Sequence, residues 1–325
     1  MTSDSESNRL CLYHASCPDG VAAAWAVSVA HPGMEMVAVD YTTPVDPSWG
    51  KRNIILVDFC FPLENMMLLV SIAGSVLVID HHATIEKFIG AVEKHAEECG
   101  TPFELVYDKT LSGAELTFKR LFPDCYAHYG FPAPIRHTGR RDLWDFRDPR
   151  TRVVCDYLST LELTPQAWAE AFSGYEVSMR GQRSEQWHQT ELELYQKAAT
   201  VGPAIAQFRK IQIERILADG IQFVTVQQRV IPVVNVPRVF TSELLGQLAL
   251  TYPFAVGYTD LDGKRTWSLR ASAKNSDAIN VRLLAESLGG GGHAAASGFT
   301  QSYDELYDSQ GTLTWPARVS ALHPL

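Results

Sequence analysis

The sequence has no CxxC pair, although it contains 6 cysteines in 325 residues. Zinc cages and small disulfide frameworks need closely and regularly spaced cysteines. The cysteines here are scattered through the first half of the chain, at Cys11, Cys17, Cys60, Cys99, Cys125 and Cys155. This spacing favours a reduced, cytoplasmic protein over a disulfide scaffold.

Long apolar runs are also missing. No uncharged apolar stretch approaches the length that crosses a bilayer, which is about 20 residues. The chain opens on the polar segment MTSDSESNR, without the basic and then apolar pattern of a secretory leader. We therefore expect a soluble protein with no membrane partner.

Positive charge is scarce. The sequence has 28 Lys and Arg against 37 Asp and Glu, a formal net charge of -9. Binding to long duplex nucleic acid is largely phosphate neutralisation by Lys and Arg, so this class of partner is disfavoured. An anionic substrate would need metal ions or a few well-placed cations.

The first 150 residues alternate short apolar runs with helical patterns, which is typical of a doubly wound, mainly parallel sheet in an α/β fold. We expect helices at 20–30, 62–73 and 112–122, the last with a capping box from Ser112 and Glu115. The expected strands are 9–14, 34–41, 53–59 and 75–80. In such sheets, ligands bind beyond the carboxyl ends of the strands.

The second half of the chain changes character twice. Residues 164–216 are polar and helical in pattern, and we interpret them as a helical connector. Beyond it, strand patterns alternate with helices at 241–250 and 276–288, and Asp262-Gly263 indicates a hairpin turn. The predicted domains are therefore 1–163, the connector 164–216, and a smaller α/β domain at 217–325.

Metal-competent side chains gather at three predicted strand ends. A lone Asp at such a place is most often a cap or a turn residue, but three ends together are harder to explain that way. Mixed carboxylate and imidazole ligands suit catalytic Mn²⁺, Fe or Zn²⁺, and a two-ion site suits hydrolysis of phosphate esters. The residues are His14 and Asp19 after the first strand, Asp58 at the third, and Asp80, His81 and His82 at the fourth.

A glycine run near the C-terminus, GGGGHAAASGF at 289–299, supplies a second candidate site. Glycines let the backbone approach an anion closely, and His293 with the guanidinium of Arg270 would complete a phosphate contact. The alternative for the glycines alone is a flexible stop to the preceding helix.

These stretches resemble the motifs of the DHH phosphoesterases with their DHH-associated C-terminal domain. The resemblance covers nearly the whole chain, with five motifs in order. They are YHASCPDGVAAAW, ILVDFCFP, VIDHHAT, GRRDLWDF and GGGGHAAASGF. The HxxCxDG form and the RDLW element look most like the oligoribonuclease and cyclic-nucleotide phosphodiesterase branch of that superfamily.

The resemblance implies a centre of two metal ions, usually Mn²⁺, with Mg²⁺, Zn²⁺ or Fe as alternatives. The implied metal ligands are His14, Asp19, Asp58, His81 and Asp142, with Cys17 as a further candidate. Asp80 and His82 would orient a ligand or lie beside the phosphate, so that Asp58, His81, His82 and Asp80 form the catalytic group. The substrate would be held by Arg270, Gly290, Gly291, Gly292 and His293.

Cys17 departs from the first motif, because many members carry an aspartate in its place. A thiolate is a softer ligand than a carboxylate and favours Zn²⁺ or Fe over Mn²⁺. The alternative for Cys17 is a small residue packed in a tight turn. We also expect Trp25 and Trp144 to be core residues rather than base-stacking platforms. His137 is expected to be an exposed helical histidine or to face the cleft that would hold the metal ions.

Three functions remain open at this stage. The first is a metal-dependent phosphodiesterase that hydrolyses short oligonucleotides, as an exonuclease or oligoribonuclease does, or cyclic nucleotides. The second is a phosphomonoesterase acting on a nucleoside 3′,5′-bisphosphate, and the third is a nucleotide-binding protein whose hydrolytic centre has decayed at Cys17. The sequence leaves open whether the protein is a monomer or a homodimer.

Overall fold

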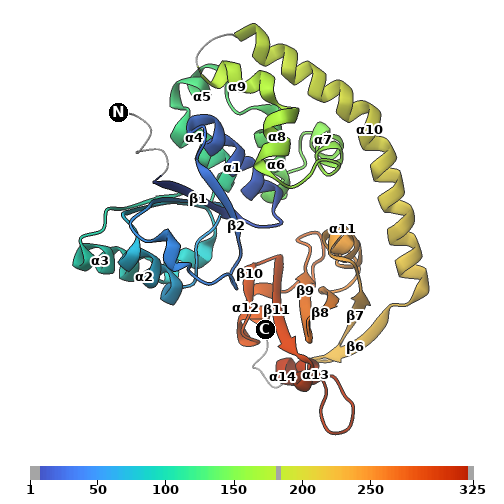
Figure 1. The fold of residues 1–325 in the computed structure, drawn as a ribbon. Coiled ribbons are helices and arrows are strands. Elements are labelled where there is room, and N and C mark those ends of the chain that lie inside the picture. Colours follow the sequence, from blue (N-terminus) through green and yellow to red (C-terminus); the bar gives the residue numbers. More distant parts are fainter. Residues whose placement is uncertain (1–7, 181–183, 321–325) are drawn as a thin grey trace. The chain divides into compact units, whose positions relative to one another are not determined.

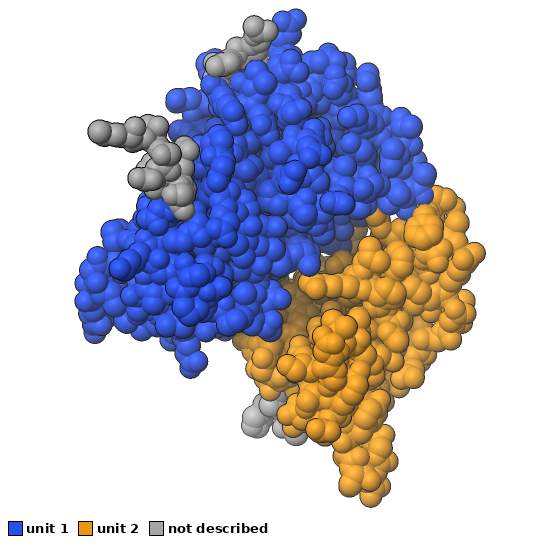
Figure 2. All heavy atoms as spheres, in the orientation of Figure 1, with its two compact units in different colours: residues 1–206 blue, residues 207–325 orange. Residues whose placement is uncertain are grey.

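The computed structural model of the chain describes residues 8–180 and 184–320. The chain divides into two compact units, residues 1–206 and 207–325, which Figure 2 shows in different colours. The division into three parts predicted from the sequence stays a prediction.

The first unit is built on a five-stranded sheet in which every neighbouring pair is parallel. The strand order is β2-β1-β3-β4-β5. The strands are β1 (Arg9–His14), β2 (Glu35–Val39), β3 (Asn53–Val57), β4 (Ser75–Asp80) and β5 (Phe103–Tyr107). The expected doubly wound parallel sheet is therefore confirmed, and β5 is an additional strand.

Helices cover both faces of this sheet (Figure 1). Alternate side chains of β1 enter different cores. Leu10 and Leu12 pack with residues of α2 and α3, whereas Cys11 and Tyr13 pack with residues of α1 and α4. The four helices are α1 (Pro18–Ala30), α2 (Leu63–Ile72), α3 (Ile89–Cys99) and α4 (Gly113–Leu121). Short 3-10 helices lie at Pro47–Trp49 and Ala83–Lys87.

A helical layer lies against α1. Trp25 of α1 is fully buried and contacts the rings of Trp168, Phe172 and Tyr175, so the prediction that it is a core residue is confirmed. The helices of this layer are α5 (Pro123–Tyr129), α6 (Ala133–Asp142), α7 (Arg150–Leu158), α8 (Pro165–Ala171) and α9 (Ser173–Met179). The long helix α10 (Ser184–Asp219) follows them in the chain. None of the helices in the described ranges is long and apolar enough to span a membrane.

The second unit contains a six-stranded sheet in the order β10-β11-β9-β8-β7-β6. Its pairs are antiparallel except β7 and β8, which are parallel and are joined by α11. The strands are β6 (Gln222–Val226), β7 (Arg229–Asn235), β8 (Ala255–Leu261), β9 (Lys264–Arg270), β10 (Gly291–His293) and β11 (Ala296–Ser302). The helices are α11 (Arg238–Leu248), α12 (Val281–Ser287), α13 (Tyr303–Leu306) and α14 (Thr314–Ser320).

The predicted hairpin between β8 and β9 is confirmed. Asp262 and Gly263 both have positive φ, 50° and 73°, as a tight two-residue hairpin turn requires. The glycine run is more than a flexible stop to the preceding helix. Gly289, at φ 80°, follows the end of α12, and the next glycines enter β10, which pairs with β11.

The order of the first sheet determines where a ligand can bind. The chain places β2 on one side of β1 and then continues to β3 on the other side, so the connections above the carboxyl ends of β1 and β3 diverge. Such a switch point leaves a crevice where open α/β sheets bind their ligands. His14 ends β1 and Asp58 directly follows β3, so both lie at this point.

Candidate metal centre

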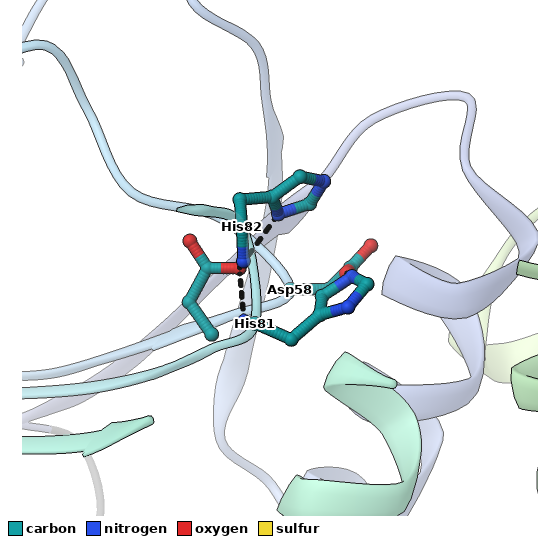
Figure 3. Close-up of side chains that lie close together, drawn as sticks. Asp58, His81 and His82 are labelled. Carbon is teal, nitrogen blue, oxygen red and sulfur yellow. Dashed lines mark hydrogen bonds and ion pairs between the residues drawn. The ribbon is translucent and has the colours of Figure 1, made fainter. Parts of the chain in front are cut away.

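Asp58 is at the middle of the predicted site. Its carboxylate contacts two imidazoles from the neighbouring strands, with Oδ2 lying 3.3 Å from His14 Nδ1 and Oδ1 lying 3.3 Å from His81 Nε2. The Nε2 atom of His81 also lies 3.4 Å from Asp142 Oδ2, at the end of α6. Figure 3 shows the ring of His81 beside the carboxylate of Asp58. Residues from four separate segments therefore converge on one spot.

Two buried polar atoms in this group lack hydrogen bonds. Asp58 and His81 are only 1% and 3% exposed, and within the described part of the chain Asp58 Oδ1 and His81 Nε2 have no hydrogen-bond partner. Leaving such atoms unsatisfied in an interior is costly. A metal ion accepts lone pairs from both a carboxylate and an imidazole, so the residues fit a bound cation.

Three overlapping sets of side chains could hold metal ions. Within each set, the ligating atoms all lie within 4.8 Å of one another. Asp58 and His81 each belong to two sets, which is what neighbouring ions sharing ligands require. The sets are Asp58, Asp80, His81 and His82; then His14, Cys17 and Asp58; then Asp19, His81 and Asp142.

The acidic groups of the centre raise one another's pKa values. Burial raises the pKa of Asp142, and the charge of Asp58 raises it further. The pKa of Asp19 is raised well above its ordinary value by the same two causes. Burial and these carboxylates also raise the pKa of the Cys17 thiol. Cations in the centre would relieve this repulsion and favour the ionised ligands.

Asp58 itself is held ionised. Burial disfavours its charge, but the imidazoles of His14 and His81 outweigh that effect and bring its pKa below the usual range. The pKa of His81 is raised, because its contact with Asp58 outweighs the loss of hydration on burial. Asp58 is thus a buried, charged carboxylate that could hold a cation.

Asp80 organises the loop that carries the two histidines. Its Oδ1 accepts hydrogen bonds from the backbone N–H groups of His81, at 2.7 Å, and His82, at 3.2 Å, and lies 2.7 Å from His82 Nδ1. Although burial opposes it, this contact raises the pKa of His82 to about 9. Asp80 therefore orients the imidazole of His82 and holds the backbone of His81.

Asp19 reaches the centre from the first turn of α1. Its Oδ1 accepts a hydrogen bond from Ser112 Oγ at 2.8 Å, and its Oδ2 accepts one from the Ala114 N–H at 3.0 Å. Ser112 is also the N-cap of α4, and the predicted capping box with Glu115 is confirmed. The sequence shows this capping box but not the bond to Asp19, which joins residues 93 positions apart.

The backbone of Asp58 and its surroundings were not anticipated. Asp58 has φ 54°, in the left-handed region that non-glycine residues rarely adopt, and such strain concentrates at functional sites. Two glycines allow close approach. A Cβ at Gly113 would lie 2.5 Å from Asp58 Cβ, and one at Gly20 would lie 2.5 Å from the His14 carbonyl oxygen. Gly20 follows the motif residue Asp19 and Gly113 follows the capping residue Ser112, and this adjacency was the available signal.

The residues predicted to hold substrate lie in the second unit. Arg270 ends β9, and its guanidinium donates to the Leu269 carbonyl at 2.9 Å and to Ser242 Oγ at 3.0 Å. His293 pairs with Ala296 and Ala296 with Arg270 across adjacent strands, so the three side chains share one face of the sheet. Gly291 and Gly292 belong to β10, and Gly290 packs directly against Phe299 of β11.

Two expectations about individual residues are wrong. Trp144 is 58% exposed rather than in the core. His137 is fully buried rather than exposed or facing a cleft, with Nδ1 3.0 Å from Thr151 Oγ1 and Nε2 2.9 Å from the Tyr195 hydroxyl. It sits on the inner side of α6, where these hydroxyls satisfy both ring nitrogens.

Comparisons with known proteins give distant likenesses, and no family model matches the chain. The chain is 23% identical over 315 residues to the uncharacterized protein R106 of Acanthamoeba polyphaga mimivirus, covering 90% of this chain and 67% of that protein. The pGpG-specific phosphodiesterase PggH of Vibrio cholerae is similar with TM-score 0.40 and 15% identity, covering 92% of this chain and 95% of that one. RecJ of Thermus thermophilus, in complex with Mn²⁺, has TM-score 0.48 and 15% identity, covering 96% of this chain and 51% of that one. The chemistry of the site therefore rests on its own residues.

Proposed function

We propose that this protein is a divalent-metal-dependent phosphodiesterase of the DHH type that hydrolyses short oligonucleotides or cyclic dinucleotides. One observation carries the proposal. The buried atoms Asp58 Oδ1 and His81 Nε2 face each other at 3.3 Å without a hydrogen bond, at the switch point of a parallel sheet. The order of the five sequence motifs supports the same assignment.

The metal centre would be held by His14, Asp19, Asp58, His81 and Asp142, with Cys17 as a further ligand. Ions bound there supply Lewis-acid activation of water and neutralise charge on the phosphate. Asp58 would serve both candidate ligand sets to which it belongs, because its two oxygens face different imidazoles. Manganese is the favoured ion, and the softer thiol of Cys17 would shift one site toward Zn²⁺ or Fe.

His82 has a different role in this proposal. It is half-buried, and its contact with Asp80 raises its pKa to about 9 against the opposing effect of burial. A protonated imidazole beside the metal ligands would donate a hydrogen bond to a phosphate oxygen, where negative charge increases during hydrolysis. Asp80 would keep that imidazole charged and oriented.

The second unit carries the residues that we propose to contact a substrate phosphate. Arg270 is half-buried, and among the described residues no carboxylate lies within ion-pair distance of its guanidinium. Burial lowers its pKa, so an anionic ligand would stabilise the charge. Across β9, β11 and β10, only the small side chain of Ala296 lies between Arg270 and His293 on this face of the sheet. A Cβ at Gly291 would meet nothing within 4 Å, which leaves room for a ligand on β10.

The charge balance favours short substrates. The protein carries a net charge of -9, so a long polyanion would be repelled outside the few cationic positions. A dinucleotide or cyclic dinucleotide needs only a metal centre and one further phosphate contact. We therefore place short oligonucleotides and cyclic dinucleotides ahead of long polymers.

The test is a turnover assay in Mn²⁺, repeated in Mg²⁺, Zn²⁺ and Fe²⁺. The panel contains 5′-labelled oligonucleotides from two residues upward, cyclic dinucleotides and nucleoside 3′,5′-bisphosphates. We expect release of mononucleotides from the shortest substrates and loss of turnover in EDTA. Release of inorganic phosphate from the bisphosphates alone would instead establish a phosphomonoesterase, and nucleotide binding without turnover in any metal would establish a decayed centre.

The matched variants are Asp58→Asn in the centre and Asp124→Asn on the exposed first turn of α5. Asp58→Asn should abolish turnover and remove the stabilisation by Mn²⁺, which is about 2.7 kcal/mol when the free ion exceeds its Kd a hundredfold. Asp124→Asn should behave as the wild type. Full activity in Asp58→Asn would overturn the proposal.

A further inference from the structure

Trp144 is unlike every other tryptophan in the protein. The chain has 7 tryptophans, all within the described ranges, and the other members of the set are at most 6% exposed. Trp144 is 58% exposed. A large aromatic side chain left in solvent gives up the burial that stabilises the others, so its position calls for a partner outside the chain.

The backbone at Trp144 makes the placement more unusual. Helix α6 ends in a Schellman motif, in which the Trp144 N–H donates to the Arg141 carbonyl at 3.1 Å and the Asp145 N–H to the Arg140 carbonyl at 2.6 Å. Trp144 occupies the left-handed position of this motif, with φ 58°. Glycine takes that position without strain, whereas a bulky aromatic residue is rare there.

Nearby side chains support the indole on one side. The rings of Trp144 and Phe146 make a T-shaped contact with centroids 5.1 Å apart. The guanidinium of Arg152 lies 4.0 Å from the centroid of Phe146 and fixes that ring in turn. The indole is thus braced while much of its surface stays open, which is the form of a stacking platform.

The platform lies close to the metal centre. Asp142, two residues before Trp144, has its carboxylate 3.4 Å from His81 Nε2. Two residues of chain span at most about 7 Å, so the indole is attached within a nucleotide's length of a candidate ligand. The Schellman bonds hold that short connection in one conformation.

We propose that Trp144 stacks on the nucleobase adjacent to the phosphate held at the metal centre. The inference rests on the proposed phosphodiesterase function and adds a substrate-binding residue to it. Stacking on an aromatic ring tolerates any base, because every base has a π-face. Trp144 would thus select nucleotides over phosphate esters that lack a base.

Fluorescence gives a test that does not depend on turnover. The full-length protein, with Ca²⁺ in place of Mn²⁺, is titrated with the dinucleotide pApA while tryptophan emission and its quenching by acrylamide are recorded. We expect pApA to quench the exposed tryptophan and protect it from acrylamide, and ribose 5-phosphate, which lacks a base, to do neither. Trp144→Phe should abolish the signal, because the remaining tryptophans are buried. An unchanged signal in Trp144→Phe would overturn the assignment.

Steady-state kinetics in Mn²⁺ separate stacking from a structural role. Trp144→Gly removes the ring and relaxes the left-handed backbone, so its thermal stability in EDTA should equal or exceed that of the wild type. Its KM for pApA should rise about tenfold or more with little change in kcat, and Trp144→Phe should recover most of that loss. An unchanged KM in Trp144→Gly would refute stacking even if hydrolysis is confirmed. Base-dependent quenching without hydrolysis in any metal would refute the phosphodiesterase and keep the nucleobase contact.

Discussion

Gly113 and Asp58 approach so closely that no side chain fits between them. A Cβ added at Gly113 would lie 2.5 Å from Asp58 Cβ and 2.6 Å from Asp58 Oδ1. The φ of Gly113 is not in the left-handed region, so the glycine serves close approach rather than backbone conformation. The start of α4 thereby packs directly against Asp58, whose backbone is in the left-handed region, and restricts the direction of its carboxylate.

Gly113→Ala should weaken both the fold and the metal centre. The added methyl group must push Asp58 or α4 aside, and overpacking of this kind costs about 1–3 kcal/mol. We expect a lower free energy of unfolding in urea with EDTA present, and a lower affinity for Mn²⁺ by titration. The matched control is Gly90→Ala in α3, where a Cβ meets nothing within 4 Å. Wild-type Mn²⁺ affinity in Gly113→Ala would show that the position of Asp58 does not matter for binding.

Ser112→Ala should lose a helix cap and a support of Asp19 together. Its hydroxyl donates to Asp19 Oδ1 at 2.8 Å and accepts from the Glu115 N–H at 3.3 Å. Losing the cap costs about 0.5–2 kcal/mol. Losing a bond behind a metal ligand lowers metal affinity by about 10–100-fold.

The control for Ser112→Ala is Thr164→Ala at the N-cap of α8, where the hydroxyl accepts only from the Ala167 N–H in the described contacts. It should lower the free energy of unfolding by a similar amount and leave Mn²⁺ affinity unchanged. Equal Mn²⁺ affinity in both variants would place Asp19 outside the centre.

His137 should make the protein less stable in acid. Burial lowers its pKa from 6.5 to about 3, and the charge of Arg136 contributes in the same direction. Below pH 6.5, His137 therefore binds a proton in the unfolded chain but stays neutral in the folded protein. Stability contributed by the neutral imidazole is complete above that pH and falls by about 1.4 kcal/mol per unit as the pH decreases toward 3.

The measurement compares wild type and His137→Gln by urea unfolding in EDTA at pH 7 and pH 5. We expect the wild type to lose about 2 kcal/mol more than the variant over this interval. His188→Gln, at an exposed position of α10, should follow the wild type. Equal losses in wild type and His137→Gln would show that His137 accepts a proton while folded.

The sheet and its polar edge were predictable, because strand periodicity and parallel order place the ends of β1, β3 and β4 together. The strand β5 was not predicted, because FELVY is short and contains Glu104. The hydrogen bond from Ser112 to Asp19 was not predicted for another reason. It depends on how α1 and α4 pack, and no local sequence pattern encodes that packing. The burial of Trp144 was misjudged because apolar character alone does not tell whether a tertiary neighbour covers a side chain.

The glycine run shows the same limit from the other direction. Four glycines read locally as a flexible stop or a loop, yet Gly291 and Gly292 pair with Gly298 and Ser297 in a strand. That pairing depends on β11, whose position is set by its own partner β9. Neighbouring strands thus decided a conformation that glycine itself leaves open.

The contact between His14 and Asp58 joins residues 44 positions apart, and Asp142 adds a group from still further along the chain. The chain between these residues must fold back before the candidate ligands come together. Forming such long-range contacts is slow. During refolding, manganese uptake would lag behind the appearance of helical signal and mark the moment when the first unit is complete. Asp142, at the end of α6, is the last carboxylate to join the centre along the chain.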